Sequence, residues 1–210
     1  MATFAALKTA ISTRLQDENN TAVSAAIVGQ AVNEAISYWS NREFWFNEDL
    51  ETITLMASNP VVPSVPSTLR SILNPGGMVI DYNGQKWPMS PVSTAEYDAQ
   101  DDGAENMPDV YTYRAGQIEV FPIPDQAYTL NLRYLKGYAD LSGDTDTNDF
   151  TNNAADLIKY TALGKLKGEF FEDEKMASYY NQRAADEYAL LQRRTGRLRY
   201  TGRLTVETII

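Results

Sequence analysis

The chain has 210 residues, 43% of them hydrophobic and 11% aromatic, which suffices for a packed core in one large domain or two small ones. It contains no Cys and no His, which excludes disulfides, thiol catalysis and thiolate metal sites and removes the commonest general base and transition-metal ligand. The formal net charge is −10. Because no apolar run reaches about 18 residues and no apolar leader is present, we expect neither a membrane span nor a signal peptide.

Two amphipathic helices are predicted first, over residues 3–16 and 22–41. In the first, apolar residues recur at steps of three and four, at Phe4, Leu7, Ile11 and Leu15. The apolar stripe of the second is broad enough to imply burial on more than one side; it comprises Val23, Ile27, Val28, Ala31, Val32, Ala35, Ile36 and Trp39. Thr21 is the expected N-cap of this second helix.

An aromatic cluster follows, where the hydrophobic period changes from helical to alternating. It consists of Tyr38, Trp39, Phe44, Trp45 and Phe46. Aromatic residues at a helix-to-strand junction most often pack two layers together, and this is the favoured interpretation. A sugar-stacking platform is the alternative, although no matching polar groups lie nearby in the sequence.

The central region predicts a small, mostly antiparallel β sandwich or barrel of about six strands. Two hairpin turns are expected, one at Asn83-Gly84 with type I′ geometry and one at Ala115-Gly116. A short helix between them is predicted by a capping box formed by Ser93 and Glu96. A long strand should follow the second hairpin, with one face formed by Leu130, Leu132 and Tyr134.

Helices return after a polar connector, over residues 154–170 and 173–194. Asp173 is the expected N-cap of the last helix, and Gly196 is expected to end it. The predicted fold is therefore α+β, an antiparallel four-helix bundle with an inserted small antiparallel β domain and an extended C-terminal arm. The expected boundaries are 1–48 and 140–194 for the two bundle halves, 49–139 for the β domain and 195–210 for the arm.

The arm differs in charge from the rest of the chain. Residues 193–210 hold five Arg and one Glu, a net charge of +4, whereas the other residues hold 13 basic and 27 acidic groups, a net charge of −14. An acidic body argues against wrapping DNA, so docking of the arm on an acidic protein surface is favoured over nucleic-acid binding. The TGRL repeat places Leu198 and Leu204 six residues apart, on one face of an extended chain.

No stretch of the sequence predicts a catalytic site, a metal site or a cofactor. The connector at Asp144, Asp146 and Asn148 resembles half of a calcium loop, but Asp149 and Ala155 stand where Gly and Glu are required. Helix-capping oxygens are the favoured interpretation of this connector. The acidic run at residues 97–109 offers carboxylates for glycoside hydrolysis, with no spacing that favours it over a solvated loop.

Four stretches carry a resemblance to a known family. They are AVNEAISYWSNREFWFNE, YRAGQIEVFPIPDQAYTLNLRYLKGYADLS, DTDTNDF, and LIKYTALGKLKGEFFEDEKMASYYNQRAADEYALLQRR. Together they cover most of the chain, and their order resembles that of the head-to-tail adaptor (connector) proteins of tailed bacteriophages, the tail accessory factor family. The resemblance lies in apolar and turn positions rather than in a catalytic signature.

The resemblance implies a structural virion protein at the head–tail junction, made in the host cytoplasm and requiring no cofactor or membrane. It implies a homo-oligomeric ring, commonly of twelve copies, that binds the portal protein, extends the DNA channel without binding DNA specifically, and offers a platform for a tail tube or nozzle protein. The arm would form the portal or subunit interface through Arg193, Arg194, Arg197, Leu198, Arg199, Tyr200, Arg203, Leu204, Val206, Ile209 and Ile210.

One alternative function stays open at this point. A carbohydrate-binding or tail-associated receptor or lytic module would use the aromatic residues Trp45, Trp87 and Tyr111 as stacking surfaces. Such a module should remain small in solution and bind glycans, whereas an adaptor should form large species or join its portal.

Overall fold

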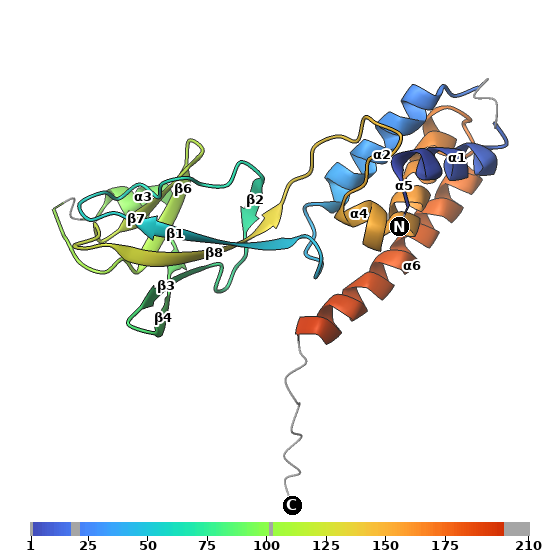
Figure 1. Cartoon of the computed structure of the whole chain (residues 1–210). Coiled ribbons are helices and arrows are strands. Elements are labelled where there is room, and N and C mark those ends of the chain that lie inside the picture. Colours follow the sequence, from blue (N-terminus) through green and yellow to red (C-terminus); the bar gives the residue numbers. More distant parts are fainter. Residues whose placement is uncertain (1, 18–21, 101–102, 200–210) are drawn as a thin grey trace, which may run out of the picture. The chain divides into compact units, whose positions relative to one another are not determined.

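The computed structural model describes residues 2–17, 22–100 and 103–199 (Figure 1). The chain divides into two compact units, a helical unit of Met1–Asn47 with Tyr138–Ile210 and a β unit of Glu48–Gly137. The α+β class is confirmed, with six helices and two sheets among the described residues. None of the described helices is both long enough and apolar enough to cross a membrane.

The helical unit is built around one hydrophobic core. Its helices are α1 (Phe4–Leu15), α2 (Ala25–Trp39), α4 (Asp149–Asn153), α5 (Ala155–Glu169) and α6 (Glu174–Arg199). Helix α5 is central, because α1, α2, α4 and α6 all pack against it. The two ends of the chain thus supply one core. Because the packing centres on α5, the antiparallel four-helix bundle stays a prediction.

The start of α2 differs from the predicted one. The helix begins at Ala25, and its N-cap is Ser24, whose hydroxyl accepts a hydrogen bond from the backbone N–H of Ile27. Thr21, the predicted cap, lies outside the described residues. The later start has a local cause, since the Asp17 carboxylate accepts hydrogen bonds from the N–H groups of Ala22 and Val23, five and six residues further along the chain. The predicted cap of α6 is confirmed, because Asp173 Oδ1 accepts the N–H of Met176 at 3.0 Å.

The β unit contains two sheets that share a second core. The larger sheet has the order β1 (Glu48–Leu55), β8 (Tyr128–Lys136), β3 (Met78–Tyr82), β4 (Gln85–Pro88), with β2 (Leu69–Ile72) also pairing with β8. The smaller has the order β5 (Ser90–Pro91), β6 (Val110–Arg114), β7 (Gln117–Phe121), and only the short β5–β6 pair is parallel. Both sheets contribute buried side chains to the core, among them Ile80, Leu130, Leu132, Ile118 and Val120.

The local turn and cap predictions for the β unit are confirmed. Asn83 and Gly84 have φ angles of 53° and 75° between β3 and β4, as a type I′ turn requires. The second hairpin turns at Ala115 and Gly116, between β6 and β7. The short helix α3 (Thr94–Asp98) has the predicted capping box of Ser93 and Glu96.

The prediction that the last helix stops before Thr195 is wrong. Helix α6 continues through Gly196 to Arg199, and Gly196 does not take the left-handed conformation of a helix-ending glycine. A glycine inside a helix costs only about 1 kcal/mol relative to alanine, so contacts elsewhere can override it. Arg194 and Arg199, on either side of Gly196, provide such contacts with Trp45 and Glu43. Residues 195–199 are therefore not an extended arm, and residues 200–210 lie outside the described part of the chain.

Candidate interface at the end of helix α6

The C-terminal half of α6 packs on the aromatic residues that follow α2. The Tyr188 ring lies 4.9 Å from the Trp39 ring and 6.0 Å from the Phe44 ring. Phe44 is fully buried and stacks on Phe46 at 5.1 Å, and Phe150 of α4 packs edge-on against both at 5.8 and 5.1 Å. Within the helical unit the cluster thus joins helices from the two ends of the chain. Its predicted role in packing a helical layer on a strand layer stays a prediction.

Beyond this cluster, three polar contacts attach the basic end of α6 to the segment Glu43–Trp45. The Arg194 guanidinium lies over the Trp45 ring, 4.3 Å from its centroid. Arg199 Nη1 donates to Glu43 Oε2 at 2.7 Å, and Gln192 Nε2 donates to the Glu43 backbone carbonyl at 3.0 Å. These contacts explain why the helix runs past Gly196.

The interface residues expected from the sequence therefore fall into three groups. Arg194 and Arg199 contact their own helical unit, whereas Arg193 and Arg197 are exposed and have no ion pair among the described residues. Leu198 is also exposed, at 48% of its surface. Tyr200, Arg203, Leu204, Val206, Ile209 and Ile210 lie outside the described residues. Sequence reasoning missed Glu43 and Trp45 as partners of the arginines, since neither lies near them in the chain.

Replacing Arg194 by Ala should loosen the last turns of α6 without unfolding the helical unit. A cation–π contact at an exposed site contributes about 0.5–1 kcal/mol, so we expect a two- to fivefold loss of amide protection in residues 194–199. Hydrogen exchange measures this directly. Arg193→Ala is the matched control, and equal loss of protection in both variants would show that the Trp45 contact does not hold the helix end.

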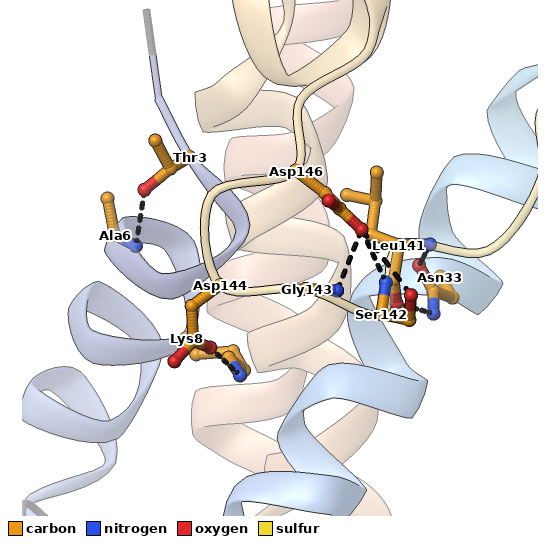
Figure 2. A network of polar contacts seen from close by, with 9 residues as sticks. All are labelled: Thr3, Ala6, Lys8, Asn33, Leu141, Ser142, Gly143, Asp144 and Asp146. Carbon is orange, nitrogen blue, oxygen red and sulfur yellow. Dashed lines mark hydrogen bonds and ion pairs between the residues drawn. The ribbon is translucent and has the colours of Figure 1, made fainter.

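A second polar network fixes the connector that leads from the β unit into α4 (Figure 2). Asn33 of α2 bonds both backbone groups of Leu141 at 3.0 Å, and Lys8 of α1 pairs with Asp144 at 2.8 Å. The backbone carbonyls of Asp144 and Asp146 accept the N–H groups of Ala5 and Phe4, so the connector caps the start of α1. Asn148 caps α4 in turn. The interpretation of this stretch as a source of helix-capping oxygens is confirmed.

The carboxylate of Asp146 is directed into the connector. It accepts the N–H groups of Ser142 and Gly143 at 2.9 and 2.7 Å, and these bonds lower the pKa of Asp146 below its ordinary value. A carboxylate held in this way is occupied by backbone donors rather than open to a cation. Among the described residues, no group of three or more acidic, His or Cys side chains is placed to hold a metal ion.

Asp146→Asn should therefore destabilise the helical unit in a pH-dependent manner. The folded-state pKa is lowered, so the stabilisation is complete above the unfolded pKa of about 3.9 and is lost as pH falls through the folded value. We expect the melting-temperature difference from wild type to be constant from pH 7 to about pH 5 and to shrink below about pH 4. Asp140→Asn, at an exposed neighbouring position, should show no such trend, and a pH-independent difference for Asp146→Asn would contradict the assignment.

The described acidic residues of the other candidate site form structural contacts. In the acidic run at residues 97–109, Asp98 forms an ion pair with Arg114 at 2.7 Å, and Arg114 is also held by Glu119 through two hydrogen bonds of 2.7 and 2.9 Å. Ser58 donates to Glu105 at 3.4 Å, and Asp101 and Asp102 lie outside the described residues. Among the described residues of this acidic run, no two carboxylates face each other across an open site, as glycoside hydrolysis requires.

The proposed aromatic platform is not supported by the positions of its members. Tyr111 is buried in the core of the β unit, with 5% of its surface exposed. Trp45 belongs to the helical unit and is covered by Arg194, which leaves Trp87 on β4 as the exposed member of the three. Stacking of a sugar across all three rings would require Tyr111 to leave the core.

Arg193, Arg197 and Leu198 thus stand exposed at a helix end that is anchored on an aromatic cluster, a surface suited to contacts with another protein. The chain belongs to the SU10 adaptor protein family, whose model matches residues 2–207. The resemblance to phage adaptor proteins is thereby confirmed, and with it a structural role. A search of curated proteins found no match.

Proposed function

We propose that this chain forms a ring adaptor between the portal and the tail of a phage virion, where it extends the DNA channel and provides a platform for tail attachment. The observation that carries the proposal is the family match over residues 2–207, which spans the helical unit, the β unit and most of the C-terminal segment. A ring of twelve copies, bound to the portal on one side and to a tail tube or nozzle protein on the other, is the assembly we infer.

Charge supports the channel part of the proposal. The β unit holds 12 acidic and 5 basic residues, a net charge of −7, and the whole chain carries −10. A wall of negative charge repels DNA phosphates and so permits passage of the genome without specific binding. Residues 193–210, with a net charge of +4, are the part suited to bind acidic protein surfaces.

The attachment surface we propose runs from the end of α6 into the segment that follows it. Arg193, Arg197 and Leu198 are exposed on the last turns of a helix anchored through Arg194 and Arg199. An anchored helix end presents the following residues from a defined point, which lowers the entropic cost of binding. Each exposed charge contact contributes only about 0–1 kcal/mol, but repetition around a ring multiplies the effect.

Mixing the purified chain with portal rings of the same phage tests the proposal. We expect a complex of portal and adaptor in analytical ultracentrifugation, with ring density added to the portal in negative-stain electron micrographs. Binding should weaken as salt rises, because the arginine contacts are electrostatic. A chain that stays small, leaves the portal bare and binds glycans instead would overturn the adaptor role and favour a carbohydrate-binding module.

A further inference from the structure

Strand β1 forms an edge of the larger sheet and is open along its outer side. In the described part of the chain it pairs only with β8. Leu50 lies opposite Arg133, whose N–H and C=O groups bond Gly77 and Leu73 on the side away from β1. The backbone groups of Leu50 therefore point away from β8, and those of Thr52 and Thr54 point the same way because direction alternates along a strand. These three alternate residues thus direct backbone groups outward, toward a further strand. The N–H of Leu50 donates to Asp49 Oδ1 at 2.9 Å, a bond that pairing with such a strand would replace.

The side chains along this edge form a distinct pattern. Ile53 is buried in the core of the β unit, and the alternation of the strand places Asp49 and Glu51 on that same face, in the exposed first half of β1. Leu50 lies on the opposite face with 57% of its surface exposed. Among the described residues Glu51 has no ion-pair partner, while Asp49 lies 4.0 Å from Lys136 and accepts the N–H of Leu50 through Oδ1 at 2.9 Å. A complementary strand needs a basic side chain on one face and an apolar one on the other.

The C-terminal segment has this pattern in its sequence. After Arg199 the chain reads YTGRLTVETII, in which Arg203 directly precedes Leu204 and Val206 follows on the face of Leu204. Laid antiparallel to β1 with Leu204 opposite Leu50, it places Arg203 opposite Glu51 and diagonal to Asp49. This arginine–glutamate pair falls at a non-hydrogen-bonded position, where opposing side chains approach most closely. In the parallel arrangement with the same leucines opposed, Glu207 would face the buried Ile53.

We propose that residues 200–206 of a second copy of this chain add to β1 as an antiparallel strand, so that each subunit clasps its neighbour. The inference rests on the proposed ring and names the partner of its C-terminal segment. A neighbouring copy is the partner we assign, because a head-to-tail contact of this kind can close into a ring.

The natural absence of cysteine allows a direct test by disulfide cross-linking. Directly opposed Cα atoms in an antiparallel pair are about 4.5–5.5 Å apart, within the range that a disulfide spans. Leu50→Cys and Leu204→Cys are made as separate full-length variants, mixed in equal amounts and oxidised, both alone at high concentration and with portal rings present. We expect a disulfide between the two variants that exceeds the product of either variant alone. Tyr113→Cys, exposed on β6 of the smaller sheet, replaces Leu50→Cys as the control and should give none.

Exchanging the charges of Glu51 and Arg203 tests the proposed pairing more specifically. Glu51→Arg or Arg203→Glu alone should lower the cross-linking yield about two- to fivefold, and the two combined should restore it. No cross-link between variants in either condition, or a cross-link formed only within a chain that carries both cysteines, would overturn the proposal. Portal binding is measured separately on each variant. Portal binding without the cross-link therefore refutes the clasp alone, and the cross-link without portal binding refutes the adaptor proposal alone.

Discussion

Phe44→Ala should cost the helical unit about 3–5 kcal/mol of unfolding free energy. Phe44 is fully buried and contacts the rings of Phe46, Phe150 and Tyr188. The substitution removes one member of each of these aromatic pairs and leaves a cavity between α4 and α6 that rigid neighbours fill only in part.

Denaturant unfolding followed by tryptophan fluorescence measures this cost for the helical unit alone. In a Trp87→Phe background, the remaining tryptophans are Trp39 and Trp45, which both belong to that unit. Tyr38→Ala is the matched control, because Tyr38 is an aromatic residue of the same cluster with 56% of its surface exposed, and it should change stability by less than about 1 kcal/mol. Equal losses in the two variants would show that Phe44 does not anchor the core.

Local sequence signals predicted the local structure well. Asn83-Gly84 suits a turn with two positive φ angles, and the Ser93–Glu96 box caps its helix, because both features depend on residues adjacent in the chain. The helices that form the core also follow their apolar periodicity. The oxygen-rich side chains of the connector predicted its role in helix capping, although the residues that it contacts on α1 and α2 lie more than 100 positions away in the chain.

The errors arose where side-chain contacts override the apolar pattern. Asp17 binds the backbone of Ala22 and Val23, five and six residues later, which shifts the start of α2 to a cap that the pattern alone did not favour. At the other end, contacts with Glu43 and Trp45 carry α6 past Gly196, although those residues are about 150 positions earlier. The order of strands in the larger sheet is likewise set by pairing between β1 and β8, which no turn connects.

Removing residues 200–210 should abolish assembly while leaving the stability of the monomer nearly unchanged. The cut follows Arg199, so it retains Thr195 and the contacts of Arg194 and Arg199 with the helical unit. It removes Tyr200, Leu204, Val206, Ile209 and Ile210, together with Arg203. If only two of the apolar side chains are buried on assembly, their loss removes about 3–6 kcal/mol, which weakens binding by a factor of about 100 to 20,000.

A longer truncation, after Gln192, separates the role of the helix end from that of the segment beyond it. This variant also loses Arg194, Thr195 and Arg199, so it should lower the melting temperature as well as prevent assembly. Calorimetry and portal co-sedimentation on both truncations distinguish the two effects. A chain ending at Arg199 that still joins the portal and its neighbours at wild-type affinity would restrict the attachment surface to the exposed residues of α6, Arg193, Arg197 and Leu198. It would also remove the basis for a clasp on β1.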